Sequence, residues 1–120
     1  MPKVPTISVV DDDLSVREAT VDLLRAMGFK VEAFSRAEEF LASELRYNTS
    51  CLISDMRMPG LSGLELYNRL VKQGIPIPTI LITAFPNDGD KERALRSGVV
   101  GYLTKPFNEA EILEFIRAVL

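Results

Sequence analysis

The sequence predicts a doubly wound α/β fold built on a five-stranded parallel sheet. Short apolar runs alternate five times with segments of helical periodicity, and several of these runs are continuously apolar, as in strands that are buried on both faces. Parallel strands need crossover connections, and helices in those connections cover both faces of the sheet. The alternation therefore favours α/β over an antiparallel arrangement.

Length and composition predict one soluble globular domain over residues 1–120. The chain is 47% apolar and 26% charged, and its formal net charge is -3. Because there is no basic cluster, we expect no direct binding of nucleic acid or of an anionic membrane by this domain.

Residue usage also limits compartment and chemistry. The single cysteine, Cys51, lies in an apolar run and is expected to be a reduced core residue. No apolar stretch has the form of a signal peptide or membrane span, so we expect a cytoplasmic protein. The sequence has no histidine, which excludes imidazole bases and histidine-ligated zinc. Any chemistry at a functional site must therefore come from carboxylates, hydroxyls and lysines.

The first strand is predicted over Thr6 to Val10, which is short and β-branched. A helix from Leu14 to Met27 follows, because apolar residues there recur at helical spacing. Asp13 is its expected N-terminal cap and Gly28 its stop.

The second strand is predicted over Lys30 to Phe34, where polar and apolar residues alternate as in a half-buried edge strand. Ser35 and Glu38 have the spacing of a capping box that opens the second helix. That helix is expected to include Phe40, Leu41 and Leu45.

The third strand, Cys51 to Ser54, runs directly into Asp55 and then a Pro-Gly turn. Helical periodicity from Leu64 to Val71 predicts the third helix, which Gly74 ends. The fourth strand is predicted over Thr79 to Ile82.

The fourth helix is the weakest prediction, because Pro86, Asn87 and Gly89 interrupt the start of the segment 85–97; we expect it to be short and pliant. The fifth strand is predicted over Val99 to Thr104. Asn108 and Glu111 form a second capping-box pattern for the last helix. Its inward-facing residues are expected to be Ile112, Phe115, Ile116, Val119 and Leu120.

Five strand–helix units suit the flavodoxin-like strand order 2-1-3-4-5. This order places the ends of the first and third strands side by side at the topological switch point. Asp11, Asp12 and Asp55 would then be neighbours.

Polar residues follow four of the strands, and all would share one edge of the sheet. Three close carboxylates repel one another, so either one of them takes up a proton, with a raised pKa, or cations compensate the charge. Lys105 supplies one positive charge, and a divalent ion is expected to supply the rest. Oxygen-only ligands beside a lysine suit Mg²⁺ and phosphate. The set is typical of phosphoryl transfer, with Asp55 as nucleophile and with Thr83 and Lys105 binding phosphoryl oxygens.

Over its whole length the sequence resembles the receiver domain of two-component response regulators. The resemblance rests on the acidic pair in VVDDD, on SDMRMPGLSG around Asp55, on LITA at Thr83 and on GYLTKPF at Lys105. It implies that Asp55 accepts a phosphoryl group from a phosphohistidine on a sensor kinase or a histidine phosphotransfer protein.

The resemblance also implies the metal ligands. Asp11, Asp12 and Asp55 would hold Mg²⁺, for which Mn²⁺ or Ca²⁺ can substitute, together with the main-chain carbonyl of Arg57. The Arg57 side chain would be free. The Lys105-Pro106 peptide bond is expected to be cis.

A two-state switch is implied as well. The phosphoryl group would draw Thr83 toward Asp55, Tyr102 would turn inward, and the face formed by helix four, strand five and helix five would change. A C-terminal output domain, absent from this chain, is expected to bind DNA and regulate transcription, a hint carried by FSRAEEFL in the second helix. A phosphorylation-dependent homodimer is a further expectation.

Three other functions compete with this interpretation. Haloacid-dehalogenase-type phosphatases share the nucleophile, hydroxyl, lysine and Mg²⁺, but carry a second Asp where this chain has Arg57. A flavodoxin would need a phosphate-binding loop after the first strand, where DDDLS would repel phosphate. A pseudo-receiver that is never phosphorylated fits poorly with the intact set of acids, Thr83 and Lys105.

Two positions depart from commoner members of the family. Arg57 and Phe85 each lie two residues beyond a predicted site residue, next to the expected path of the hydrolytic water. We expect their bulk to slow self-dephosphorylation.

Overall fold

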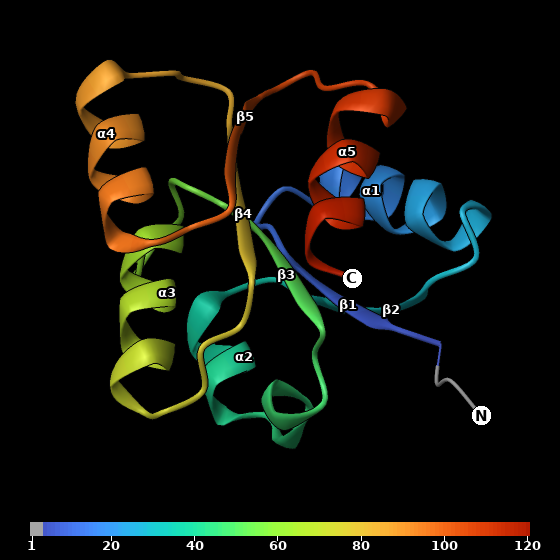
Figure 1. The fold of residues 1–120 in the computed structure, drawn as a ribbon, viewed down its shortest axis with the longest axis horizontal. Coiled ribbons are helices and arrows are strands. Elements are labelled where there is room, and N and C mark those ends of the chain that lie inside the picture. The colour runs from blue at the N-terminus through green and yellow to red at the C-terminus, as the bar shows by residue number, and fades with distance from the viewer. Residues whose placement is uncertain (1–3) are drawn as a thin grey trace.

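The computed structural model describes residues 4–120, and its five parallel strands lie in the order β2-β1-β3-β4-β5 (Figure 1). The predicted fold class and strand order are confirmed. In the pair of β1 and β3, Val10, the last residue of β1, lies beside Ser54, so β3 extends one residue further, to Asp55. The strands are β1 (Thr6–Val10), β2 (Lys30–Phe34), β3 (Cys51–Asp55), β4 (Thr79–Thr83) and β5 (Gly101–Thr104).

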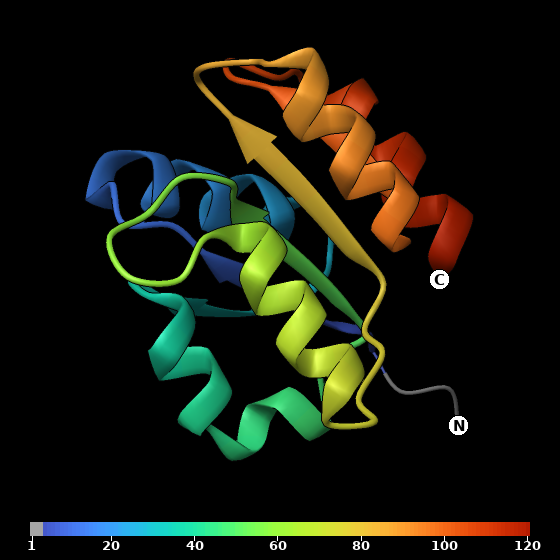
Figure 2. The same ribbon diagram turned by 90° about the vertical axis from the view of Figure 1, so that its left-hand side faces the viewer.

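Helices cover both faces of the sheet. The helices α1 (Leu14–Ala26) and α5 (Glu109–Val119) lie on one face, as Figure 1 shows. The other face carries α2 (Ala37–Ala42), α3 (Gly63–Lys72) and α4 (Asp88–Ser97), which come to the front in Figure 2. A 3₁₀ turn, η1 (Glu44–Tyr47), follows α2.

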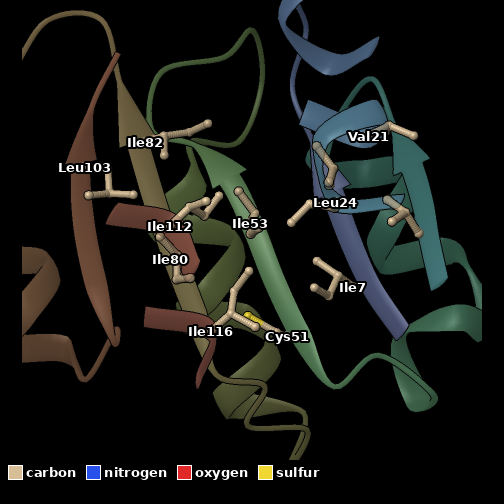
Figure 3. Close-up of a cluster of buried hydrophobic side chains, with 12 residues drawn as sticks. Ile7, Val21, Leu24, Cys51, Ile53, Ile80, Ile82, Leu103, Ile112 and Ile116 are labelled. Carbon is tan, nitrogen blue, oxygen red and sulfur yellow. The ribbon is translucent and has the colours of Figure 1, made fainter. Parts of the chain in front are cut away.

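The strands are held by apolar cores on both sides. On the side of α1 and α5, Ile53 and Ile80 from the sheet pack with Leu24 and Ile112 from the helices, all fully buried (Figure 3). Each such side chain contributes about 1.5–3 kcal/mol of hydrophobic free energy. Phe40, Leu66 and Leu70 are buried in the core on the opposite face. Burial on both faces fixes the strand ends that carry the polar residues.

Several local predictions are confirmed. Asp13 caps α1, since its carboxylate accepts a hydrogen bond from the Val16 amide at 3.1 Å. Asn108 and Glu111 form the predicted capping box of α5. The Lys105-Pro106 bond is cis.

The capping box predicted at Ser35 and Glu38 is wrong. The helix α2 begins at Ala37, with Arg36 at its N-cap position, and within the described chain Arg36 makes no side-chain capping bond. The Ser35 hydroxyl donates instead to the Glu39 carboxylate. The carboxylate of Glu38, which the local pattern assigned to the cap, instead lies against Gly60 in the loop after β3.

Three further boundaries differ. Leu45 lies in η1 rather than in α2, because α2 ends after six residues. Val99 precedes β5, and its amide donates to the Ala94 carbonyl at the end of α4. Leu120 was expected to face inward but is 47% exposed, because the helix ends one residue earlier.

Within residues 4–120 no helix has both the length and the apolar character needed to cross a membrane.

Candidate functional site

The predicted site residues meet at the carboxyl edge of the sheet. Asp11 follows β1 directly, Asp55 is the last residue of β3, Thr83 is the last residue of β4, and Lys105 follows β5. Carboxylate oxygens of Asp11, Asp12 and Asp55 lie within 4.8 Å of one another. The strand order therefore brings these acids together as predicted.

Asp11 is fully buried and each of its oxygens has a donor. One carboxylate oxygen accepts from the Asp13 amide at 2.9 Å, and the other accepts from Lys105 Nζ at 3.0 Å. The Asp11 carbonyl accepts from Arg17 Nη1 at 2.7 Å. A buried charge held in this way keeps its orientation.

The Lys105 ammonium also reaches Asp55, with Nζ 3.4 Å from Oδ1. Burial raises the pKa of Asp55 to about 6, and the charges of Asp11 and Asp12 act in the same direction while Lys105 opposes them. Burial lowers the pKa of Lys105, but the hydrogen bonds and charges of Asp11 and Asp55 outweigh it, so the net shift is upward. A single lysine only partly neutralises three acids.

The donor set fits a hard divalent cation. All the side-chain donors are carboxylate oxygens; Asp11 and Asp55 are buried, whereas Asp12 is exposed on the solvent side. The pKa of Asp55 is raised first by burial and then by the charge of Asp11, with a smaller contribution from Asp12, and a divalent cation beside the carboxylate would oppose these effects. Oxygen ligands with room for water suit Mg²⁺.

Thr83 is 1% exposed and is tied to the loop that follows it. Its Oγ1 accepts a hydrogen bond from the Phe85 amide at 3.1 Å, and its carbonyl accepts from the Lys105 amide at 2.7 Å. The Phe85 side chain is 72% exposed. The Thr83 hydroxyl is thus coupled to the segment that leads into α4.

Tyr102 lies on β5 against the small core beneath α4, which includes Leu81 and Ala94. Its hydroxyl oxygen is buried and, among residues 4–120, makes no hydrogen bond of normal geometry. Burial raises the pKa of this hydroxyl; the nearby main chain of Asn87 opposes the rise and Asp90 adds to it. The hydroxyl therefore faces inward, toward the start of α4.

The prediction that the Arg57 side chain is free is wrong. Its Nη2 lies 2.8 Å from Oδ2 of Asp90, a residue of α4 that sequence reasoning missed. Asp90 also accepts from Arg93. The three-residue spacing of Asn87 and Asp90, which marks a helix N-terminus, was a signal for an ordered α4, and Asn87 does cap this helix.

Gly63 is a second residue whose role the sequence left as a simple helix entry. A Cβ at this position would overlap the Asp55 carbonyl oxygen and press on Leu81 and Ser54. The first residue of α3 is therefore packed against the end of β3. Only glycine allows so close an approach.

Fold and site together define a doubly wound α/β domain with three acids and a lysine at the carboxyl edge of its sheet. Residues 7–117 match the family described as the response regulator receiver domain. The chain belongs to this family, as its motifs had indicated.

Known proteins that are similar to this chain are also response regulators or transcriptional regulators. The response regulator protein TodT of Pseudomonas putida is 42% identical over 95% of this chain and 50% of its own length. The transcriptional regulatory protein FixJ of Azorhizobium caulinodans is 35% identical over 100% of this chain and 57% of its own. The solved structure of the response regulator StyR superposes with a TM-score of 0.89 at 43% identity, covering 98% of this chain and 60% of that one. The chain spans about half the length of the curated relatives it matches.

Proposed function

We propose that Asp55 is the phosphoacceptor of this receiver domain and takes its phosphoryl group from a phosphohistidine on a sensor kinase or a histidine phosphotransfer protein. The observation that carries the proposal is the position of Asp55 at the end of β3, between the acids Asp11 and Asp12 and the ammonium of Lys105. Asp11, the other buried acid of this edge, also contacts Lys105, but both of its carboxylate oxygens already accept hydrogen bonds, one from the Asp13 amide and one from Lys105 Nζ.

In the reaction, a carboxylate oxygen of Asp55 attacks the phosphorus atom. The new O–P bond replaces the P–N bond to the histidine of the donor, and the imidazole nitrogen leaves with the electron pair. Lys105 stabilises the ionised nucleophile and then binds a phosphoryl oxygen, while the Thr83 hydroxyl donates to another.

Asp11, Asp12 and Asp55, with the Arg57 carbonyl, would hold Mg²⁺ or a substituting Mn²⁺ or Ca²⁺. When bound, the ion neutralises charge on the phosphoryl oxygens. The fully satisfied Asp11 supplies a fixed ligand, and exposed Asp12 leaves the solvent side open to the donor.

Thr83 and Tyr102 transmit the conformational change that follows phosphorylation. When Thr83 turns toward the phosphoryl group it gives up its bond from the Phe85 amide, so the loop before α4 must move. Tyr102 lies behind this loop with its hydroxyl already buried, and it keeps or adjusts that inward position as the loop shifts. The surface of α4, β5 and α5 is the proposed output face.

A receiver of this kind controls a second component. The chain matches about half of TodT and FixJ, so we propose a covalently linked DNA-binding output domain beyond residue 120 and a role in transcription in the cytoplasm. A phosphorylation-dependent homodimer through the output face fits the same scheme. The domain itself is a signalling module that assists only its own phosphorylation and dephosphorylation.

The phosphatase alternative is not supported. Arg57 occupies the position of the second aspartate that such enzymes use as acid and base, and its guanidinium is paired with Asp90. The family match also points to a signalling domain.

Binding of beryllofluoride, which mimics a phosphoryl group on a carboxylate, tests the proposal. We expect ¹⁹F and amide NMR to detect Mg²⁺-dependent binding to the parent protein and none to Asp55→Asn. The matched control Asp22→Asn, an exposed acid on α1, should bind as the parent does. Equal binding by Asp55→Asn would refute the assignment.

A further inference from the structure

Three charged side chains form a cluster beside the carboxylate centre, and one of their ion pairs joins two different elements. The carboxylate of Asp90 is 9% exposed and accepts from both Arg57 and Arg93. The bond to Arg93 stays within α4. The bond to Arg57, at 2.8 Å, ties α4 to the loop between β3 and α3.

The Asp90 carboxylate does not bind the backbone amide of the N-cap residue, as an acid at its position in a helix often does. It is the third residue of α4, where an acid commonly returns to the N-cap amide, as Glu65 does in α3 and Glu111 does in α5. In α4, Asn87 accepts from the Asp90 amide at 3.1 Å, while the Asp90 carboxylate faces the two arginines. The group therefore serves a contact between elements rather than a cap.

Both ends of this pair are connected to residues that act in the proposed function. Arg57 lies two residues beyond Asp55, on the loop that follows β3. Asn87 and Asp90 follow the segment whose Phe85 amide binds the Thr83 hydroxyl. The hydroxyl of Tyr102 lies close enough to both charges to feel them.

We propose that the Arg57–Asp90 ion pair is a latch that stabilises the position of α4 seen here and weakens when Asp55 is phosphorylated; this rests on the proposed function. Phosphorylation replaces the single negative charge of the Asp55 carboxylate with a phosphoryl group that carries about two, and this group competes with Asp90 for the Arg57 guanidinium. Movement of the loop 84–87 would also displace Asp90, the other member of the ion pair. A contact stronger in one conformer biases the equilibrium toward it.

The test uses the affinity of the chain for beryllofluoride with Mg²⁺. If the latch opposes the bound conformation, Asp90→Asn and Arg57→Gln should each bind about threefold to tenfold more tightly than the parent, within the usual range of coupling between sites. The double variant should bind no more tightly than either single variant, because one contact is lost in all three.

Two arginines of α4 provide matched controls. Arg93→Gln removes the partner that belongs to the same helix, and Arg96→Gln removes an exposed pair with Glu92; both should bind as the parent does. Unchanged or weaker binding by Asp90→Asn, with a lowered melting temperature, would overturn the latch and leave the pair a structural contact only. A parent protein that fails to bind beryllofluoride would instead refute the proposed function, and the latch with it.

Discussion

The Nζ atom of Lys105 lies 3.4 Å from Oδ1 of Asp55, although the two residues come from the ends of different strands. The same ammonium donates to Asp11 at 3.0 Å. One cation therefore holds the proposed nucleophile and a proposed metal ligand together. Its removal should affect both folding and chemistry.

Replacing Lys105 with methionine should lower the free energy of unfolding by about 2–3 kcal/mol, because fully buried Asp11 loses its charged partner. Phosphorylation by acetyl phosphate should slow as well. Urea denaturation and intact-mass kinetics measure the two effects. Lys91→Met, on the exposed surface of α4, is the control; equal behaviour of the two variants would contradict this role for Lys105.

The stability of the metal-free protein should depend on pH through Asp55. Its pKa rises from 3.8 to about 6 on folding, so the folded state holds this proton more tightly than the unfolded chain. The contribution of the group is complete below pH 3.8 and is lost as pH rises through 6.

Asp55→Asn should therefore be more stable than the parent at pH 7 by about 1–2 kcal/mol, with little difference at pH 4. Urea denaturation in the presence of a chelator measures this difference. A difference that does not change with pH would show that Asp55 has an ordinary pKa.

Gly63→Ala should destabilise the protein by about 1–3 kcal/mol, since the added methyl group would overlap the Asp55 carbonyl. The displaced strand end should also reduce phosphorylation. Thermal denaturation and acetyl phosphate kinetics test both points. Asn68→Ala, an exposed change on the same helix, should leave both unchanged; a Gly63→Ala protein as stable and active as the parent would refute the close packing.

Phe85→Ala should shorten the lifetime of the phosphorylated protein. The side chain is 72% exposed on the loop that Thr83 holds, next to the expected path of water. A threefold faster loss of phosphate would correspond to about 0.7 kcal/mol of barrier. Intact-mass measurements over time give the rate, with Leu95→Ala, another exposed apolar residue, as the control. If Phe85→Ala loses phosphate no faster, Phe85 does not shield the bond.

The fold was predictable because its strands are short, apolar and separated by periodic helices. The limits of Lys30–Phe34 follow from alternation alone. Two local predictions failed for different reasons. Glu38 lies against Gly60 instead of capping α2, which is a long-range contact, whereas the Val99 amide donates to the Ala94 carbonyl in the helix-end turn after α4, so β5 begins later than predicted.

The acidic centre was predictable for a topological reason: the strand order brings the ends of β1 and β3 together, and with them Asp11 and Asp55. The Arg57–Asp90 pair was not, because it joins a loop to a helix that share no sequence pattern. Gly63 was underestimated for the same reason, since its close contact with β3 is a tertiary feature.

The most direct test of the account is the site of modification by acetyl phosphate. Intact-mass and peptide mass spectrometry of the parent protein with Mg²⁺ should find one phosphoryl group, located on Asp55, and none after chelation of the metal. Modification that persists in Asp55→Asn, or that maps to another residue, would contradict the central claim.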